Sequence, residues 1–260
     1  MKVSTLTLST LALVLAATSA QAQTVAALVG DKTIALVDVK TLKAGKAMTV
    51  SGIDGAVLGL DVRPADGKLY ALLADGTVVT LDPTTGAATK VSKLETTLKA
   101  GTLATVDFNP VADRLRVIGS DGTNLRANVD DGKVTTDGAL KFAETDMHKG
   151  ETPKVVAGAY TNAVKGAKET ALYDVDATIG GLLKQAPPND GVLTAVGKLG
   201  VAGPTYAFDI VTLADGTNAG WLMAADTLYK VDLATGKSTS VGKITGLGGA
   251  VRDIAILPAM

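Results

Sequence analysis

The 260-residue sequence contains no cysteine and a single histidine, His148. Without cysteine the chain has no disulfide, no thiol nucleophile and no lipoprotein attachment site. Zinc sites of the usual kind need several His or Cys ligands, so they are excluded too. A Ser-His-Asp hydrolase would have to use His148, but the sequence has no Gly-x-Ser-x-Gly turn. With no phosphate-binding loop or dinucleotide fingerprint after any strand, most common enzyme classes are excluded.

The sequence also has few aromatic residues and no excess of positive charge. Aromatic residues make up only 3% of the chain while hydrophobic residues make up 47%, so the core must consist of Val, Leu, Ile and Ala. Such side chains pack well between closely spaced sheets. The 25 basic and 26 acidic residues nearly balance. We therefore expect no nucleic-acid partner, because that binding depends on attraction to phosphates.

The N-terminal residues have the pattern of an export signal. Lys2 precedes an apolar run from Leu6 to Ala17, and Ala20-Gln21-Ala22 has the small-x-small spacing that a signal peptidase cleaves. We predict a signal peptide over residues 1–22 and a single domain over residues 23–260. The apolar run is too short to span a bilayer, and no later run is longer, so we expect no transmembrane segment. The expected location is the periplasm, the cell envelope or the extracellular space.

A short segment with a central aspartate recurs about every 45 residues. Each of the first three copies begins a series of strand-like stretches joined by tight turns, many of them Asp-Gly. The last copy stands alone near the C-terminus, like the missing first strand of the earliest unit. The copies are Leu60-Asp61-Val62, Val106-Asp107-Phe108, Phe208-Asp209-Ile210 and Arg252-Asp253-Ile254. A ring of blades closed by pairing the two chain ends explains this pattern.

The repeat predicts an all-β fold, a five-bladed β-propeller of four-stranded antiparallel blades. For the second unit the predicted strands are Leu58–Arg63, Lys68–Leu73, Thr77–Asp82 and Ala88–Leu94. For the third they are Ala104–Asn109, Arg114–Gly119, Asn124–Val129 and Val134–Leu140. The first unit has only Val25–Val29, Thr33–Val39 and Ala47–Ile53, and its inner strand would be Arg252–Leu257. Such closure leaves only short outer edges exposed.

Four aspartates occupy equivalent positions on the expected inner strands, whereas the fourth unit has Ala159 there. One interpretation is structural: each carboxylate accepts backbone N–H bonds from a neighbouring turn and fixes the registry of its blade. The alternative is a calcium or other cation held by several of them, because carboxylate oxygens suit hard ions. The four residues are Asp61, Asp107, Asp209 and Asp253.

The third unit carries a recognisable family signature. The stretch Val106–Val117, VDFNPVADRLRV, with Asp121-Gly122 and Asn124-Leu125-Arg126, resembles a secreted bacterial family catalogued as domain of unknown function forty-three ninety-four. The resemblance implies an exported propeller-like domain and brings no activity or catalytic residues. Met147-His148 departs from the pattern, since we expect relatives to carry small or amide residues there. Later motifs that match are Ala159–Asn162, Pro187–Gly191 and Leu228–Asp232.

Two further groups of residues are candidate sites. Asp146, Met147 and His148 form a polar loop in which an imidazole, a thioether and a carboxylate could hold copper, although familiar copper centres use more imidazoles. Arg114, Arg116 and Arg126 would lie side by side if their strands pair, and could grip an anionic ligand or a partner's carboxylates. The alternative for the arginines is an internal ion-pair network with Asp107, Asp113 and Asp130.

Because the sequence has few residues and motifs typical of catalysis, we favour a binding or structural role in the bacterial cell envelope, with an envelope or extracellular protein as partner. The alternative is a copper-dependent envelope redox enzyme such as a superoxide dismutase.

Overall fold

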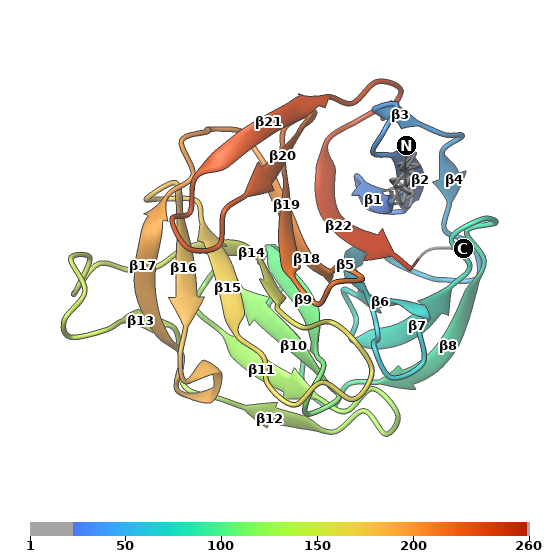
Figure 1. Ribbon diagram of the computed structural model, residues 1–260. Helices are drawn as coiled ribbons and strands as arrows, with labels where there is room; N and C mark the ends of the chain where they lie inside the picture. The colour runs from blue at the N-terminus through green and yellow to red at the C-terminus, as the bar shows by residue number, and fades with distance from the viewer. Residues whose placement is uncertain (1–22, 259–260) are drawn as a thin grey trace, which may run out of the picture.

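The computed structural model describes residues 23–258, and the predicted signal peptide lies outside this range. Within it, five sheets, antiparallel except for one edge strand, form a ring, and the chain passes round the ring once (Figure 1). We call the space enclosed by the five inner strands the channel. The prediction of a five-bladed β-propeller is confirmed. No helix in the described part of the chain is long and apolar enough to cross a membrane.

The ring closes through blade 1, which combines the two ends of the described chain. The inner strand β22 (Val251–Leu257) pairs antiparallel with β1 (Thr24–Val29), and β1 pairs with β2 (Thr33–Asp38). In Figure 1 the red arrow of β22 lies beside the blue β1. This pairing confirms the predicted closure of the ring.

The outer strand of blade 1 differs from the prediction of Ala47–Ile53. Two short strands, β3 (Lys43–Ala44) and β4 (Met48–Thr49), both pair with β2. The same segment also bonds to its neighbours, through a bridge from Lys43 to Thr245 of blade 5 and one from Ser51 to Ala87 of blade 2. Because its backbone groups are divided among three blades, this segment does not form one continuous strand.

Blades 2, 3 and 5 each contain four strands, numbered outward from the channel. Tight turns join the strands, and Gly67 and Gly76 of blade 2 have positive φ angles of 71° and 86° that favour glycine. Blade 2 comprises β5 (Val57–Val62), β6 (Leu69–Leu73), β7 (Thr77–Leu81) and β8 (Ala88–Lys93). Blade 3 comprises β9 (Ala104–Asn109), β10 (Arg114–Gly119), β11 (Asn124–Ala127) and β12 (Val134–Thr136). Blade 5 comprises β18 (Tyr206–Thr212), β19 (Asn218–Ala224), β20 (Thr227–Val231) and β21 (Ser238–Lys243).

Blade 4 has five strands rather than the predicted four. The extra strand β13 (Lys141–Phe142) pairs parallel to β17, although we had expected blade 3 to extend to Leu140. The chain leaves blade 3 at Gly138, whose backbone N–H donates to Asn189 O and where any side chain would collide with Asp190. This close approach to blade 4 captures the following residues as an edge strand. The other strands are β14 (Val155–Tyr160), β15 (Leu172–Asp176), β16 (Gly181–Gln185) and β17 (Val192–Lys198).

The hydrophobic core lies between the blades. The five inner strands contact one another in the order β22, β5, β9, β14, β18 and back to β22. Side chains alternate along each strand, so successive residues face opposite neighbouring blades. Buried aliphatic residues fill the interfaces, as with Val25 and Val37 of blade 1 against Met223 of blade 5. The sheets thereby hold the inner strands in fixed positions around the channel.

Candidate functional site

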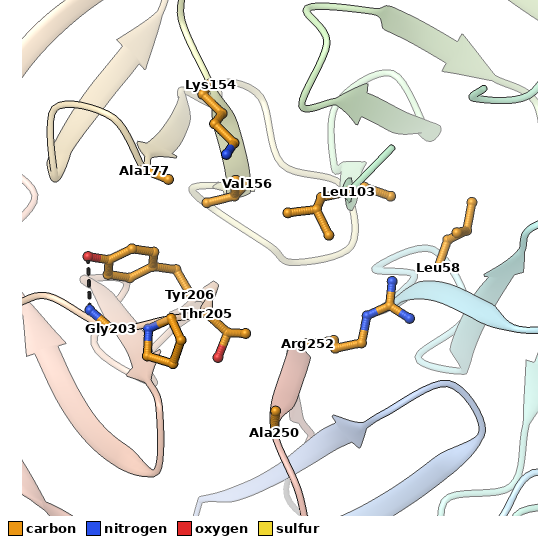
Figure 2. A pocket seen from close by; sticks show the side chains of 12 residues that line it. Leu58, Leu103, Lys154, Val156, Ala177, Gly203, Thr205, Tyr206, Ala250 and Arg252 are labelled. Atoms are coloured by element: carbon orange, nitrogen blue, oxygen red, sulfur yellow. Dashed lines mark hydrogen bonds between the residues drawn. The ribbon is translucent and has the colours of Figure 1, made fainter. Parts of the chain in front are cut away.

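A pocket of about 320 Å³ lies at one mouth of the channel, where the five inner strands begin. Every blade contributes to it, either from the first residues of its inner strand or from the loop before that strand. Two other hollows draw on blades 1 and 2 alone and are more open to solvent. The mouth is lined by Leu58, Leu103, Ala104, Lys154, Val156, Ala177, Gly203, Pro204, Thr205, Tyr206, Ala250 and Arg252 (Figure 2).

The mouth pocket combines an apolar wall with two cationic side chains. Leu103, in the wall of the pocket, is 45% exposed. Lys154 of blade 4 and Arg252 of blade 1 approach the pocket from separate blades (Figure 2). No carboxylate or imidazole is among the lining residues. The pocket therefore offers apolar contact together with positive charge.

The two cations of the mouth are held differently. Arg252 Nη1 donates to the carboxylate of Asp31. Lys154 forms no ion pair with any carboxylate of the described residues, but its backbone N–H donates to Asp176 Oδ2 over 2.6 Å. Because the backbone of Lys154 is fixed while its ammonium group is unpaired within residues 23–258, the ammonium can serve a ligand.

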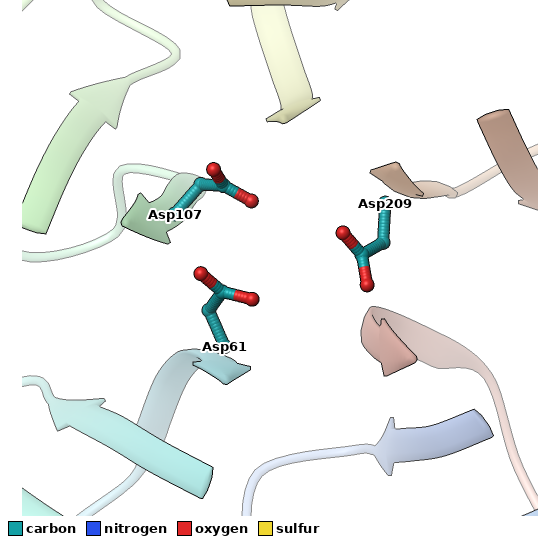
Figure 3. Close-up of side chains that lie close together, drawn as sticks. All are labelled: Asp61, Asp107 and Asp209. Atoms are coloured by element: carbon teal, nitrogen blue, oxygen red, sulfur yellow. The ribbon is translucent and has the colours of Figure 1, made fainter. Parts of the chain in front are cut away.

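Four aspartates line the channel beyond the mouth, and we call them the aspartate belt: Asp61, Asp107, Asp209 and Asp253. Asp61, Asp107 and Asp209 each lie three residues along the strand from a mouth residue, which corresponds to roughly 10 Å. Asp253 directly follows the mouth residue Arg252. Asp61, Asp107 and Asp209 point toward one another, with one oxygen of each within 4.8 Å of the others (Figure 3). Within residues 23–258 this is the one group of three such acidic or imidazole ligands.

Each belt carboxylate accepts a hydrogen bond from the inner strand of the next blade. Three also accept the N–H of their own following residue, Val62, Ile210 or Ile254. Blade 4 has Ala159 at this position and provides no such link to blade 5. The bonds between blades are Leu60 N to Asp253 (2.9 Å), Phe108 N to Asp61 (2.7 Å), Tyr160 N to Asp107 (2.9 Å) and Ile256 N to Asp209 (2.6 Å). The belt carboxylates thus accept backbone N–H bonds, as the structural interpretation expected, but the donors lie on strands rather than in turns.

Burial controls the titration of the belt. It raises the pKa of Asp61, Asp107 and Asp253 well above the ordinary value, and neighbouring carboxylates add to the shift. Burial also raises the pKa of Asp209, to about 6, against the backbone hydrogen bonds that favour its ionised form. Three converging carboxylates have suitable chemistry for a hard cation such as calcium, or for sharing protons. The cation site stays a prediction.

The structure brings together two of the three candidate arginines. Arg116 and Arg126 lie opposite each other on β10 and β11, and both bond to Asp137 at 2.6 Å. Arg116 is only 1% exposed and also donates to Tyr160, Asn124 and Asn189. The side chain of Arg114 instead donates to backbone oxygens.

An internal network is therefore present, but its predicted partners were wrong. Asp113 and Asp130 bind Arg63 of blade 2, and Asp107 belongs to the belt. The partner of the arginines is Asp137, which the sequence had placed inside an outer strand. Sequence reasoning missed both Arg63 and Asp137, because their pairing depends on how the blades pack.

Sequence reasoning also missed Asp174 on β15, which is fully buried. Neither of its carboxylate oxygens has a hydrogen-bond partner among the described residues, and the nearby hydroxyl of Thr105 has none either. Burial raises the pKa of Asp174 to about 8, although Arg116 pulls it down. The sequence does contain a signal for this residue. The Leu172–Asp176 motif matches Leu228–Asp232 except that Asp174 stands at the position of Lys230.

The side chain of Asp146 anchors the candidate copper loop. Asp146 accepts hydrogen bonds from the backbone of His148 and Ala195 at 2.8 and 2.7 Å. Met147 is 84% exposed, while the His148 ring lies against Phe142 and within 3.2 Å of Glu151. Both carboxylate oxygens of Asp146 therefore already accept backbone hydrogen bonds. Copper binding stays a prediction.

The similarity to a known family extends beyond the sequence signature in blade 3 to nearly the whole described chain. The model of the family described as Domain of unknown function (DUF4394) matches residues 33–255. The chain belongs to this family. The match spans from β2 to β22 and therefore includes the mouth, the aspartate belt and the buried arginines. No curated protein matches this DUF4394 chain.

Two solved structures similar to this DUF4394 protein are themselves of unknown function. A protein from Bacteroides thetaiotaomicron is 18% identical with a TM-score of 0.55, over 93% of this chain and 68% of that one. A protein from Bacteroides caccae is 10% identical with a TM-score of 0.49, over 91% of this chain and 99% of that one. The first similarity shows a shared fold and nothing of function.

Proposed function

We propose that this protein is an exported, non-catalytic binding protein of the bacterial cell envelope that holds its ligand or partner at the mouth of the propeller channel. The observation that carries the proposal is the mouth pocket, to which all five blades contribute apolar side chains or cations. A rigid concave site with a few polar groups is typical of ligand-binding sites. The closed ring supplies the rigidity, because each inner strand is held by its own sheet and by two neighbours.

The chemistry of the mouth supports binding rather than catalysis. General acid-base catalysis near neutral pH is most often performed by His, Asp or Glu, and none of these lines the pocket. Of the less common acid-base residues, the pocket has Lys154 and Tyr206, and no second acid-base group of the more common types lies beside them in its lining. The belt carboxylates lie farther along the channel and are engaged by backbone N–H groups. The mouth is therefore equipped to hold a molecule and has little with which to transform it.

The proposed export is supported by the pattern of residues 1–22 and is tested by cell fractionation. When the full chain is expressed, the cleaved protein should appear in the periplasmic or extracellular fraction with Gln23 as its first residue. A variant that lacks residues 2–22 should stay in the cytoplasm. Recovery of the uncleaved full chain in the cytoplasm would contradict the proposed location.

A panel of small molecules tests the proposed binding site through the thermal unfolding midpoint, Tm. The panel should contain organic acids, amines, neutral sugars and peptides, and a ligand of the mouth should raise the Tm. The Leu103→Asp variant should lose this response, whereas Leu213→Asp, at a 38% exposed leucine outside the pocket, should keep it. The same variants in pull-downs from envelope extracts test for a protein partner. If neither assay gives binding that Leu103→Asp removes, the proposal is wrong.

Metal analysis of the exported protein separates binding from the redox alternative. We expect no superoxide dismutation above that of free copper after copper is added. Stoichiometric copper with such activity, lost in a His148→Ala variant, would replace the proposed function by a redox one.

A further inference from the structure

We infer that the mouth pocket binds a small organic anion, a carboxylate with an apolar aromatic or branched aliphatic body. This inference rests on the proposed function and names the chemical class of its ligand. It follows from the charge of the mouth, from its apolar wall and from the position of the aspartate belt.

The charge of the mouth is positive. Arg252 uses one of its five N–H donors in its bond to Asp31, and the side chain of Asp31 is 68% exposed. An ion pair so open to water is weak, so Arg252 retains donors and charge for a ligand. Lys154 adds an ammonium group that has no carboxylate partner within the described residues. A carboxylate in the pocket could accept a charge-assisted hydrogen bond from either side chain.

The remaining wall of the mouth requires an apolar body on the ligand. Leu58, Leu103, Val156 and Tyr206 line the pocket, and the Tyr206 hydroxyl contacts the loop backbone at Val201 and Gly203, both at 3.3 Å. The aromatic ring is thereby fixed in the wall. A strongly hydrated inorganic ion would gain nothing from these surfaces, because apolar contact is favourable only for apolar groups. A volume of about 320 Å³ suits a small molecule rather than a folded partner.

The aspartate belt determines where such an anion stops. The belt carboxylates repel an anion to the extent that they are ionised. Asp253 directly follows Arg252 on β22, and the other three lie three residues, roughly 10 Å, farther along their strands than a mouth residue. Their oxygens accept backbone N–H bonds from neighbouring blades, and only a belt carboxyl group that holds a proton could donate to an anion. The channel thus has a cationic, apolar mouth and an acidic interior, and an anion is held at the mouth.

Isothermal titration calorimetry with three probes tests the assignment. The probes are 3-phenylpropionate, its neutral amide 3-phenylpropionamide, and inorganic phosphate, which has charge without an apolar body. We expect the carboxylate to bind, the amide to bind at least about fivefold more weakly, and phosphate not to bind. Raising the salt concentration should weaken only the binding of the carboxylate, because salt screens exposed charges.

Matched variants locate the binding and separate the two proposals. Lys154→Gln should weaken 3-phenylpropionate roughly fivefold and leave the amide unchanged, whereas Lys184→Gln, on an exposed lysine of the same blade, should change neither. Leu103→Ser should weaken both organic probes. Equal affinities for acid and amide that Lys154→Gln does not alter would overturn the anion class and leave the proposed binding site intact. Failure of both probes, while other panel members still bind, would also overturn the anion class. If no panel member or extract protein binds, both proposals fail.

Discussion

The mouth and the aspartate belt lie on the same inner strands, yet they use their polar groups in opposite ways. In the belt, Asp61 and Asp209 accept two backbone hydrogen bonds each, one of them from the next blade. At the mouth, the Lys154 ammonium group has no ion-pair partner within residues 23–258, and Leu103 remains 45% exposed. The belt carboxylates are hydrogen-bonded within the fold, whereas the Lys154 ammonium group at the mouth is left available to a ligand.

This difference separates structural charges from candidate binding charges. A buried polar group is retained only when it is bonded, so a fully engaged carboxylate or arginine indicates a role in the fold. A pocket that combines apolar side chains with a cation unpaired within the described residues is a candidate for ligand binding. Substitutions in the engaged groups should therefore affect stability, and substitutions at the mouth should affect binding.

The largest loss of stability is expected for Arg116→Met. Arg116 is 1% exposed and bonds to Asp137, Asn124, Asn189 and Tyr160. Its removal leaves Asp137 with only Arg126, so the free energy of unfolding should fall by about 3–5 kcal/mol in urea titrations. Arg114→Met, at an arginine that bonds only to backbone oxygens, is the control and should cost much less. If Arg116→Met lowers the free energy of unfolding as little as is expected for the control, the buried network is not structural.

Asp61→Ala should cost somewhat less. The backbone N–H groups of Val62 and Phe108 would lose their acceptor, which corresponds to about 2–4 kcal/mol. Removal of one of several mutually repelling acids offsets part of this loss. Urea unfolding with and without calcium measures the effect. If calcium raises the stability of the wild type and not of Asp61→Ala, the belt is a cation site as well as a scaffold.

A pH-dependent effect is expected at Asp174, whose pKa is raised to about 8 in the folded protein from an ordinary 3.8. Between these values the folded state binds the proton more tightly than the unfolded state. The stability contributed by the protonated side chain is therefore complete below about pH 4 and is lost as the pH rises toward 8. Asp174→Asn should remove a slope of up to about 1.4 kcal/mol per pH unit. The difference in stability between wild type and variant at each pH reports on Asp174 alone, because the belt acids are present in both. If the two proteins show the same dependence of stability on pH, the pKa of Asp174 is not raised in the folded state.

The smallest change in stability is expected at the mouth itself. Leu103→Ser removes an apolar side chain that is already 45% exposed, so the free energy of unfolding should change by less than about 0.5 kcal/mol. Binding of the organic probes should fall in the same variant. A loss of stability comparable to that of Asp61→Ala would mean that the mouth is part of the scaffold, and the comparison would then fail.

The sequence predicted the parts of this fold that repeat. Strands β9 (Ala104–Asn109) and β10 (Arg114–Gly119) have the predicted bounds, and the pairing of β22 with β1 was expected from the isolated Asp253 segment. The belt followed from the same repeat, because equivalent residues on equivalent strands must surround the axis. Repetition makes local pattern and global position agree.

Features that occur once could not be predicted in this way. Strand β13 joins blade 4 through Gly138, and Asp137 pairs with Arg116 because of the same departure from blade 3. The mouth pocket also had no pattern in the sequence, since its lining residues differ from blade to blade and do not repeat. Such sites depend on which blades become neighbours, and a single sequence does not encode that in a local motif.

The central claim is that the mouth binds while the belt holds the scaffold, and NMR of the ¹⁵N-labelled protein tests it directly. On titration with 3-phenylpropionate, we expect the backbone amide signals of Leu103, Val156 and Tyr206 at the mouth to shift with increasing ligand. The amides of Phe108 and Ile256, which donate to belt carboxylates, should stay in place. Shifts centred on Phe108 and Ile256, with the mouth unchanged, would contradict the account.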